Sequence, residues 1–428
     1  MSWLAFFCCF FAWFGIAPLM TVIREELHLT DSQVGWCIIA SVSMTAIARV
    51  LIGWLCDRIG PRLAYSWLLL VGGVLAIAIA FSYDFKSFLI FRLLLGGIGA
   101  SFVVTQYHTS MMFAPNVVGT ANATSAGWGN LGGGVSQFAM PLMFSMFIGV
   151  FGFSAAVGWR ASMMVAGLLC MLVAVGYFFF TQDTAEGNFR DLRLKGKIAR
   201  TEDANAAFWR TCRDPRVWTL AMVYGACFGV ELTFHNVAAI YFSDSFGLGL
   251  VAAGLAASLF GLMNLFGRTL GGLAGDWLGS AWGLRGRVTW LFVVLLCEGI
   301  ALMLFSQMRT LPFAIGTLVI FALFVEMASG ATYSVVPFLN RDSLGATAGI
   351  VGAGGNVGAV LAGFLFGGLM EWSTAFLLLG AAVVCCSLLT LSIRFSADSE
   401  RDARRELKWV AWQQHQEQQQ ARPSLESG

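Results

Sequence analysis

Long runs of apolar residues, separated by short polar or charged segments, follow one another through almost the whole chain. A helix that crosses a membrane needs about 20 mostly apolar residues, and we count about twelve such runs. The pattern predicts spans at residues 3–23, 34–55, 64–82, 88–113, 119–149, 160–180, 216–242, 250–274, 288–306, 311–337, 344–370 and 373–393. The fifth, tenth and eleventh are long enough to be tilted or broken.

Composition agrees with an all-α membrane protein, because 58% of the 428 residues are hydrophobic and only 12% are charged. Charged residues make up about a quarter of an ordinary soluble domain. The 49 glycines suit helices that pack closely in lipid. The first run starts almost at Met1 without a basic leader or a small-residue cleavage site, so we expect a retained, somewhat short span.

The ten cysteines lie mostly inside apolar runs, and their spacing indicates neither a zinc site nor a disulfide framework. We therefore expect them to pack in the core, and we expect no metal and no cofactor. The sequence also offers no nucleophile–base set, so we do not expect an enzyme.

Basic residues predict the topology. They concentrate in the segment after the sixth span, in the tail after the twelfth, and in short loops on the same side that contain Arg58, Arg62, Arg285, Arg287 and Arg341. By the positive-inside rule this side is cytoplasmic, and both termini face it. Acidic residues offset part of the positive charge of these loops, so we expect no nucleic-acid partner.

The spans and the charged segments divide the chain into four parts. We expect a first six-helix half at 1–180, a cytoplasmic linker at 181–215, a second six-helix half at 216–393 and a cytoplasmic tail at 394–428. The polar, glutamine-rich part of the tail from Ser396 to Gly428 is too short for a further domain and is interpreted as a frayed amphipathic helix.

Two arginines lie inside apolar runs, in matching contexts. Arg49-Val-Leu-Ile-Gly53-Trp-Leu-Cys-Asp57 in the second span and Arg268-Thr-Leu-Gly-Gly272-Leu-Ala-Gly-Asp276 in the eighth both read R-x-x-x-G-x-x-x-D. Spacing by four puts each set on one helical face. A charge inside a membrane helix costs roughly 3 kcal/mol or more, and neither arginine has an acid beside it on its own helix. We expect an anion to meet them, the alternative being snorkelling or local pairing.

A second motif repeats in the fifth span of each half. Gly127-Trp-Gly129-Asn130-Leu-Gly-Gly-Gly134 and Gly352-Ala-Gly354-Gly355-Asn356-Val-Gly358 share G-N-x-G. Matching motifs in matching spans predict a parallel internal repeat, and hence two pseudo-symmetric halves with a central site between them.

Both motifs are predicted to lie at the same depth in the membrane. Each arginine lies eight residues before its aspartate, which is about 12 Å deeper at 1.5 Å per residue and therefore near the midplane. Asn130 and Asn356 reach the same level. Two guanidinium forks suit a small planar oxyanion, and Gly129 and Gly355 would let it approach the backbone. The alternative for these asparagines and glycines is close helix packing.

The chain resembles a known family. Gly53 followed by Asp57-Arg58-Ile-Gly60-Pro61-Arg62 is similar to the G-x-x-x-D-R-x-G-R signature of the major facilitator superfamily, and Arg92-Leu-Leu-Leu-Gly96 is similar to a second signature. The two G-N-x-G segments resemble the paired signatures of the nitrate/nitrite porter family. Gly229-Val-Glu231-Leu and Gln106-Tyr107 resemble its branch of high-affinity nitrate importers.

The resemblance covers essentially the whole chain. It implies the major facilitator fold, alternating access, and nitrate binding by Arg49 and Arg268, and it makes Tyr224 the aromatic residue that stacks on nitrate. Asn130, Asn356, Gly129 and Gly355 would shape the site, together with one of Gln106 and Tyr107. The modest linker and tail favour a bacterial source.

Other ionisable residues inside spans are candidate proton carriers. They are Glu231, Glu298 and Glu326. Importing an anion against an inside-negative potential costs about 2.3 kcal/mol per 100 mV, and two protons per anion would drive it inward. We favour Glu231 as the carrier, although a structural hydrogen bond is the alternative. Glu298 is interpreted as structural, and His108 and His235 as satisfied hydrogen-bonding residues.

These observations predict a monomeric nitrate transporter of the inner (plasma) membrane that also accepts nitrite and imports nitrate with protons for assimilation. Asp57, Arg58, Arg62 and Asp276 would hold the cytoplasmic side closed. A nitrate/nitrite antiporter is the alternative within transport, and a non-transporting nitrate sensor is the alternative from another class.

Overall fold

The computed structural model describes residues 1–196, 201–248, 250–340, 343–366 and 370–405. Within these ranges the chain is helical apart from turns, short irregular segments and one isolated β-bridge between Thr184 and Gly187. The prediction of an all-α membrane protein is confirmed, because ten helical segments of the described residues are long and apolar enough to cross a membrane. The part of the predicted tail helix at residues 406–428 lies outside the described residues.

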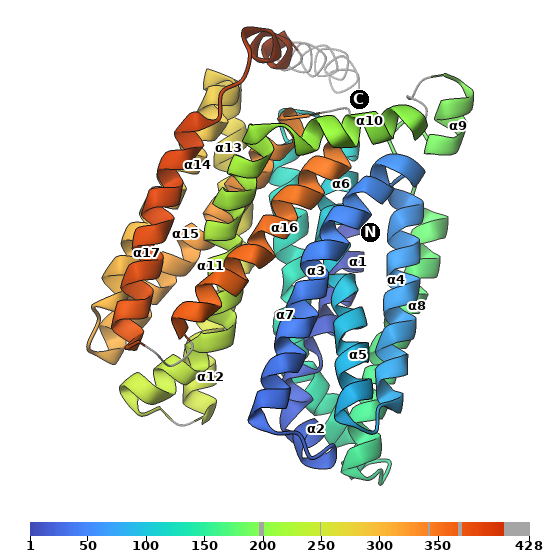
Figure 1. Cartoon of the computed structure of the whole chain (residues 1–428), viewed down its shortest axis with the longest axis vertical. Coiled ribbons are helices and arrows are strands. Elements are labelled where there is room, and N and C mark those ends of the chain that lie inside the picture. The colour runs from blue at the N-terminus through green and yellow to red at the C-terminus, as the bar shows by residue number, and fades with distance from the viewer. Residues whose placement is uncertain (197–200, 249, 341–342, 367–369, 406–428) are drawn as a thin grey trace, which may run out of the picture.

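The first half of the chain has a helix at every predicted span (Figure 1). In chain order the elements are α1 Ser2–Phe14, η1 Ala17–Leu19, α2 Met20–Glu26, α3 Asp31–Ile59, α4 Pro61–Ala78, η2 Ile79–Phe81, α5 Phe85–Leu95, η3 Gly96–Ala100, α6 Ser101–Met112, α7 Val118–Gly149 and α8 Ala155–Phe180.

The second half follows two short helices, α9 Phe189–Leu194 and α10 Thr201–Cys212. Its elements are α11 Pro215–Phe246, α12 Leu250–Leu262, η4 Met263–Leu265, α13 Gly267–Trp282, α14 Leu284–Ser306, α15 Leu311–Val335, η5 Val336–Phe338, α16 Leu344–Gly363, η7 Phe364–Phe366, α17 Trp372–Leu389 and η8 Thr390–Ser392.

Local sequence signals explain where the arginine-bearing helix α3 begins and ends. Thr30 and Gln33 form a capping box at its start, so two backbone donors that lack helical partners are satisfied. Gly60 ends the helix with φ +88°, a conformation that favours glycine. Pro61 then starts α4, where its missing N–H costs no hydrogen bond.

Of the three spans predicted to be tilted or broken, the fifth is one unbroken helix, α7, even though it contains Pro141. The tenth passes from α15 into η5 and the eleventh from α16 into η7. The fourth and eighth spans, for which no break was predicted, are interrupted by the 3₁₀ segments η3 and η4. Successive glycines in η3 weaken the α-helical pattern and leave carbonyl groups free for other partners. Gly96 O accepts from Thr45 Oγ1 at 2.6 Å.

Figure 1 shows α9 and α10 at the same end of the molecule as the start of the C-terminal tail, with α2 and α12 at the opposite end. We call the first of these the linker end. There Asp183, just beyond α8, accepts hydrogen bonds at 2.8 Å from the backbone N–H groups of Arg62 and Phe189. Burial raises the pKa of the Asp183 carboxyl, and these two bonds offset part of the rise.

The two halves meet through glycines of the repeated motif. A Cβ on Gly53 of α3 would lie 2.1 Å from the backbone oxygen of Gly345 in α16, and one on Gly272 of α13 would lie 2.3 Å from that of Gly119 in α7. Both positions therefore place backbone against backbone across the halves. The glycine of each motif is required by packing between the halves.

Gly53→Ala should force the halves apart at the linker end. Overpacking costs about 1–3 kcal/mol, which lowers the ratio of closed to open molecules by roughly fivefold to more than a hundredfold. Spin labels at the exposed Leu63 and Arg285 report the distance between the halves. Gly316→Ala is the control, because a Cβ there meets nothing within 4 Å. An unchanged distance distribution for Gly53→Ala would refute this role.

Candidate functional site

Arg49 is completely buried and reaches from α3 to the other half. Its Nη1 donates to Gly352 O in α16 at 2.5 Å, and its Nε donates weakly to Gly99 O at 3.5 Å. Its Nη2 has no hydrogen-bond partner. No acidic side chain of the described residues forms an ion pair with Arg49, so this charge is balanced only by carbonyl dipoles and nearby rings.

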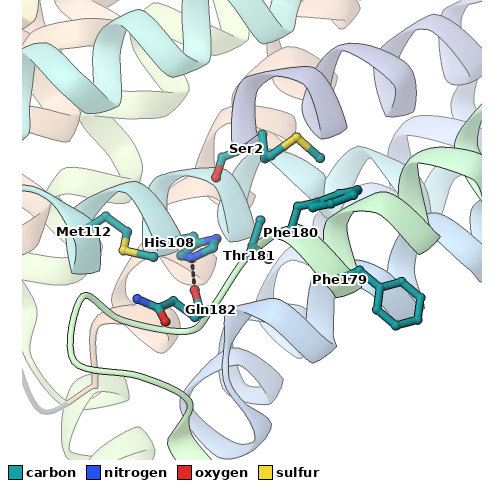
Figure 2. Close-up of a pocket in the computed structure, with 8 residues that line it drawn as sticks. Ser2, His108, Met112, Phe179, Phe180, Thr181 and Gln182 are labelled. Carbon is teal, nitrogen blue, oxygen red and sulfur yellow. Dashed lines mark hydrogen bonds between the residues drawn. The ribbon is translucent and has the colours of Figure 1, made fainter.

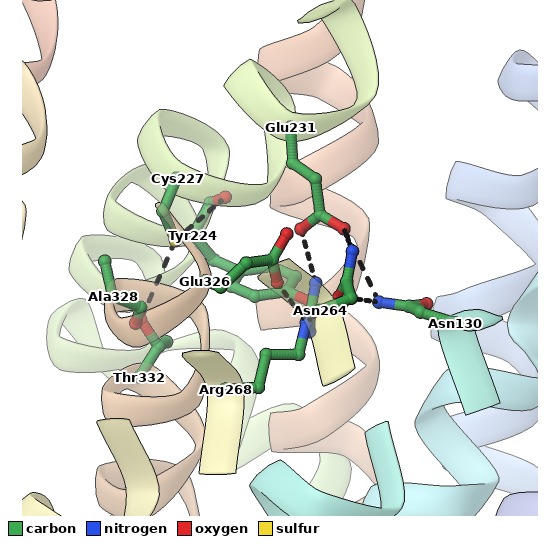
Figure 3. Close-up of polar contacts among 9 residues, drawn as sticks. All are labelled: Asn130, Tyr224, Cys227, Glu231, Asn264, Arg268, Glu326, Ala328 and Thr332. Carbon is green, nitrogen blue, oxygen red and sulfur yellow. Dashed lines mark hydrogen bonds and ion pairs between the residues drawn. The ribbon is translucent and has the colours of Figure 1, made fainter. Parts of the chain in front are cut away.

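Arg268 is equally buried but is held by acids from two other helices (Figure 3). Its Nε donates to Glu326 Oε2 at 2.8 Å and to Asn264 Oδ1 at 2.9 Å, and its Nη2 binds Glu231 Oε2. Asn264 Nδ2 also donates to Glu231 Oε1 at 3.2 Å. We call these four residues the Arg268 network.

The two arginines are thus equivalent in sequence but not in environment. As expected, neither arginine is paired with an acid of its own helix among the described residues. Arg268 is nevertheless paired with acids of other helices, whereas Arg49 is not. The acids come from α11 and α15, so no inspection of the arginine's own helix could reveal them. Glu231, predicted as a proton carrier, is directly bonded to Arg268.

Aromatic rings fill the space between the arginines. The guanidinium carbon of Arg49 lies 5.0 Å from the ring centroid of Phe228, and that of Arg268 lies 5.5 Å from the same centroid. Phe228 stacks on Tyr224 with centroids 5.1 Å apart, and Arg49 also lies 5.2 Å from the ring of Phe102. Both cations face ring π-systems, which attract them.

Tyr224, the predicted stacking residue, is buried at this place, and its hydroxyl has no hydrogen-bond partner. Phe228 is the residue that the sequence argument missed. It lies one helical turn after Tyr224, so the four-residue spacing on α11 was the available signal.

Asn130 contacts the Arg268 network, whereas Asn356 has no hydrogen-bond partner among the described residues. Asn130 Nδ2 reaches across the halves to Asn264 Oδ1 at 3.3 Å and to Glu231 Oε1 at 3.5 Å. When the nitrogen and oxygen of the Asn130 amide are interchanged, its oxygen accepts from Arg268 Nη2 at 3.0 Å and from Arg268 Nε at 3.2 Å. Asn356 is fully buried, and neither its nitrogen nor its oxygen has a partner.

The adjacent glycines make room for rings and do not expose the backbone to an anion. A Cβ on Gly129 would lie 1.9 Å from the ring of Phe6, and one on Gly355 would lie 2.6 Å from that of Phe228. The prediction that these glycines admit an anion to the backbone is therefore wrong in this conformation. The alternative, close packing, holds.

Gln106 and Tyr107 are both buried. Gln106 Nε2 donates to Asn122 O at 3.1 Å. Among the described residues, the hydrogen-bond partners of Arg49 and Arg268 include neither of these side chains.

The two motif aspartates cap helices of the opposite half at the linker end. Asp57 accepts from the N–H groups of Gly345 and Ala346, both at 3.0 Å, where α16 begins. Asp276 accepts from those of Gly119 at 3.1 Å and Thr120 at 2.6 Å, where α7 begins. A carboxylate at a helix N-terminus satisfies free donors and complements the helix dipole. These paired caps join the halves.

The arginines predicted to assist this closure do not cross between the halves. Arg58 lies over the ring of Trp54 at 4.8 Å, and Arg62 Nε donates to Phe178 O at 2.7 Å, so both bind within the first half. The residue that does cross is Arg287, which pairs with Asp276 at 2.5 Å and donates to Pro115 O at 2.9 Å. From the sequence, Arg287 served only as one of the basic residues that predict which side of the membrane is cytoplasmic.

A separate cavity of about 520 Å³ lies beside His108 (Figure 2). His108 Nε2 lies 2.7 Å from Gln182 O, which it can approach only as a donor, and its Nδ1 bonds the Tyr177 hydroxyl. His108 is thus a satisfied side chain, as predicted. The residues that line this cavity include no arginine, lysine, aspartate or glutamate.

Known proteins similar to this chain agree with the sequence resemblance. The family model described as Major Facilitator Superfamily matches residues 2–340. "High affinity nitrate transporter 2.5" of Arabidopsis thaliana is 40% identical over 92% of this chain and 79% of its own length. "Nitrate/nitrite transporter NrtP" of Nostoc punctiforme is 29% identical over 91% and 90%.

Among solved structures, the proton:xylose symporter XylE has the same fold, with a TM-score of 0.69 at 13% identity over 96% of this chain and 97% of its own. That likeness concerns the fold alone. The predicted fold and family are both confirmed. This chain belongs to the Major Facilitator Superfamily and, within it, to the family that contains the high-affinity nitrate transporters and NrtP.

Proposed function

We propose that this protein is a secondary active nitrate transporter that imports the anion with protons by alternating access. The observation that carries the proposal is Arg49, a fully buried guanidinium at the contact between the halves with no acidic partner among the described residues and with Nη2 unbonded. An isolated buried charge is costly. An anion that visits this place would supply the missing partner.

Other unsatisfied donors favour a small oxyanion. Asn356 lies four residues after Gly352, whose carbonyl group binds Arg49, so both positions are on one face of α16. The Asn356 amide and the Tyr224 hydroxyl both lack partners, although buried polar groups are normally hydrogen-bonded. Nitrate is planar, has three acceptor oxygens and carries one charge, so it can satisfy all of these donors.

Arg268 would join the anion only by exchanging a partner. Its Nε and Nη2 are occupied by Glu326, Asn264 and Glu231. Glu231 is the partner that also faces Asn130 of the other half. Nitrate therefore competes with the Glu231 carboxylate for Arg268, and a proton on Glu231 favours the exchange because it removes the competing charge. This competition couples the anion to a proton.

The direction of transport follows from charge. Moving an anion into a cell at an inside-negative potential costs about 2.3 kcal/mol per 100 mV. Two protons per anion reverse the sign of the moved charge and drive import for assimilation. The linker end, with its basic residues, is cytoplasmic in this proposal, the chain functions as a monomer in the inner membrane, and the paired aspartate caps close that side.

Nitrate uptake into liposomes that contain only this protein tests the proposal. With an acidic exterior and no internal anion, we expect accumulation that collapses when a protonophore is added. Uptake that starts only after nitrite is loaded inside would establish the antiporter instead. Binding of nitrate without any flux would favour the sensor, and a failure to bind nitrate would refute the whole proposal.

Arg49→Lys should weaken nitrate transport steeply. Lysine keeps the charge but loses the planar fork, and a hydrogen bond to a charged group is worth about 1.5–3 kcal/mol. We expect the KM for nitrate to rise about tenfold to hundredfold. Arg285→Lys, at an exposed position of the second half, is the control. A KM for Arg49→Lys equal to that of the parent would exclude Arg49 from the binding site.

Glu231→Gln should remove the dependence of uptake on external pH. Glutamine cannot ionise, so nitrate reaches Arg268 without a proton having to neutralise a competing carboxylate. Initial uptake rates across a pH series give the measurement, and Glu371→Gln at an exposed position gives the control. If the pH profile keeps its parental shape, Glu231 is a structural partner of Arg268 and carries no proton.

A further inference from the structure

One member of the Arg268 network was not singled out by the sequence argument. Asn264 lies in η4, four residues before Arg268, and only 3% of the residue is exposed. Figure 3 shows its amide between Glu231, Arg268 and Asn130. Its backbone is equally confined, because a Cβ on Gly127 of the other half would lie 2.5 Å from the Asn264 carbonyl oxygen. Asn264 is therefore held in place at the contact between the halves.

The neighbours of Asn264 determine which way its amide points. Arg268 Nε can only donate, so the atom 2.9 Å from it is the Asn264 side-chain oxygen. An ionised Glu231 can only accept, so the atom 3.2 Å from its Oε1 is the Asn264 nitrogen. One short side chain thus binds the cation and the anion of the same ion pair, which requires an acceptor and a donor side by side.

The first half has a different residue at the equivalent position. Thr45 lies four residues before Arg49, as Asn264 lies four residues before Arg268. Thr45 Oγ1 donates to Gly96 O within its own half, and no acid of the described residues pairs with Arg49. The two halves therefore differ at the position where the second half binds the acidic partner of its arginine.

Asn264 favours the empty site over the anion-bound site. In the proposed function, on which this inference rests, nitrate replaces the Glu231 carboxylate at Arg268 Nη2 when Glu231 carries a proton. The bond from Arg268 Nε to Asn264 is present before and after this exchange, so its contribution cancels. The bond from Asn264 to Glu231 does not cancel, because a hydrogen bond to an ionised group is roughly twice as strong as one between neutral groups.

Other charged or titratable groups also act on Glu231, and they come from the helices packed around it. They are Arg268 of α13, Arg49 of α3, Tyr224 and His235 of α11, Glu298 of α14 and Glu326 of α15. A substitution of Asn264 leaves all of them in place. Its effect on the competition for Arg268 can therefore be assigned to the amide.

We propose that Asn264 is a positioning residue that makes nitrate binding depend on the proton, because it holds the ionised Glu231 carboxylate on Arg268. With Asn264 present, nitrate displaces Glu231 only after Glu231 has been neutralised. Without Asn264, nitrate takes Arg268 from a carboxylate that is still ionised, so the anion moves with fewer protons.

Asn264→Leu tests this assignment in liposomes, because leucine is of similar size and makes neither hydrogen bond. In the parent, the KM for nitrate should rise as the external pH is raised and Glu231 ionises. In the variant we expect the KM at alkaline pH to fall about fivefold to tenfold below that of the parent, with little change at acidic pH. Loss of a residue that only supports the fold, or that binds nitrate itself, would instead raise the KM at every pH.

The Glu231→Gln background is the matched control. It contains no carboxylate for Asn264 to hold, so adding Asn264→Leu there should change the KM at alkaline pH by less than about twofold. The difference between the two backgrounds isolates the interaction between Asn264 and Glu231. Equal effects of Asn264→Leu in both backgrounds would overturn the proposal.

The outcomes separate this inference from the proposed function. A parent that moves no nitrate, or whose KM does not depend on pH, refutes the proposed function and this inference together. A parent with the expected pH dependence, combined with an Asn264→Leu variant whose KM at alkaline pH is unchanged or higher, refutes only the role of Asn264.

A second variant guards against a folding defect. Asn264→Ala adds no atoms beside the tight contact with Gly127, and nitrate-dependent thermal stabilisation in detergent checks that each variant is folded. We expect the same fall in KM at alkaline pH from this variant. A KM raised at every pH in the folded alanine variant would contradict the assignment.

Discussion

Two buried guanidinium groups at the contact between the halves impose the constraint on which the site depends, because charge in such a place must be balanced. Arg268 is balanced by Glu231 and Glu326, and Arg49 by no acid of the described residues. The asymmetry gives the arginines different tasks. In the proposed function, Arg49 offers an open donor to an incoming anion, whereas Arg268 must first give up a carboxylate.

The same helices connect this charge balance to the closure of the linker end. In each R-x-x-x-G-x-x-x-D motif the arginine lies in the site, the glycine packs backbone against backbone with the other half, and the aspartate caps a helix of that half. The three residues share one face of a rigid helix. A movement of the other half away from Gly53 and Asp57 must therefore also disturb the contact between Arg49 and Gly352.

Much of this arrangement could be predicted from the sequence, because it depends on periodicity within single helices. The positions of the helices and the common face of the three residues in each R-x-x-x-G-x-x-x-D motif follow from spacing. The acid partners of Arg268 could not be predicted in this way, since Glu231 and Glu326 lie on helices that only the fold brings to α13. Gly129 and Gly355 were ambiguous for a similar reason: a glycine can admit a ligand or a ring, and only the position of Phe6 or Phe228 decides.

The most direct test of this account is the number of protons taken up when the purified protein binds nitrate. Isothermal titration calorimetry in buffers of different ionisation enthalpy gives that number without any transport step. In the proposed function nitrate displaces the Glu231 carboxylate from Arg268. That displacement predicts an uptake of about one proton per bound anion in the parent and none in Glu231→Gln. Nitrate binding by the parent without proton uptake would contradict the competition for Arg268.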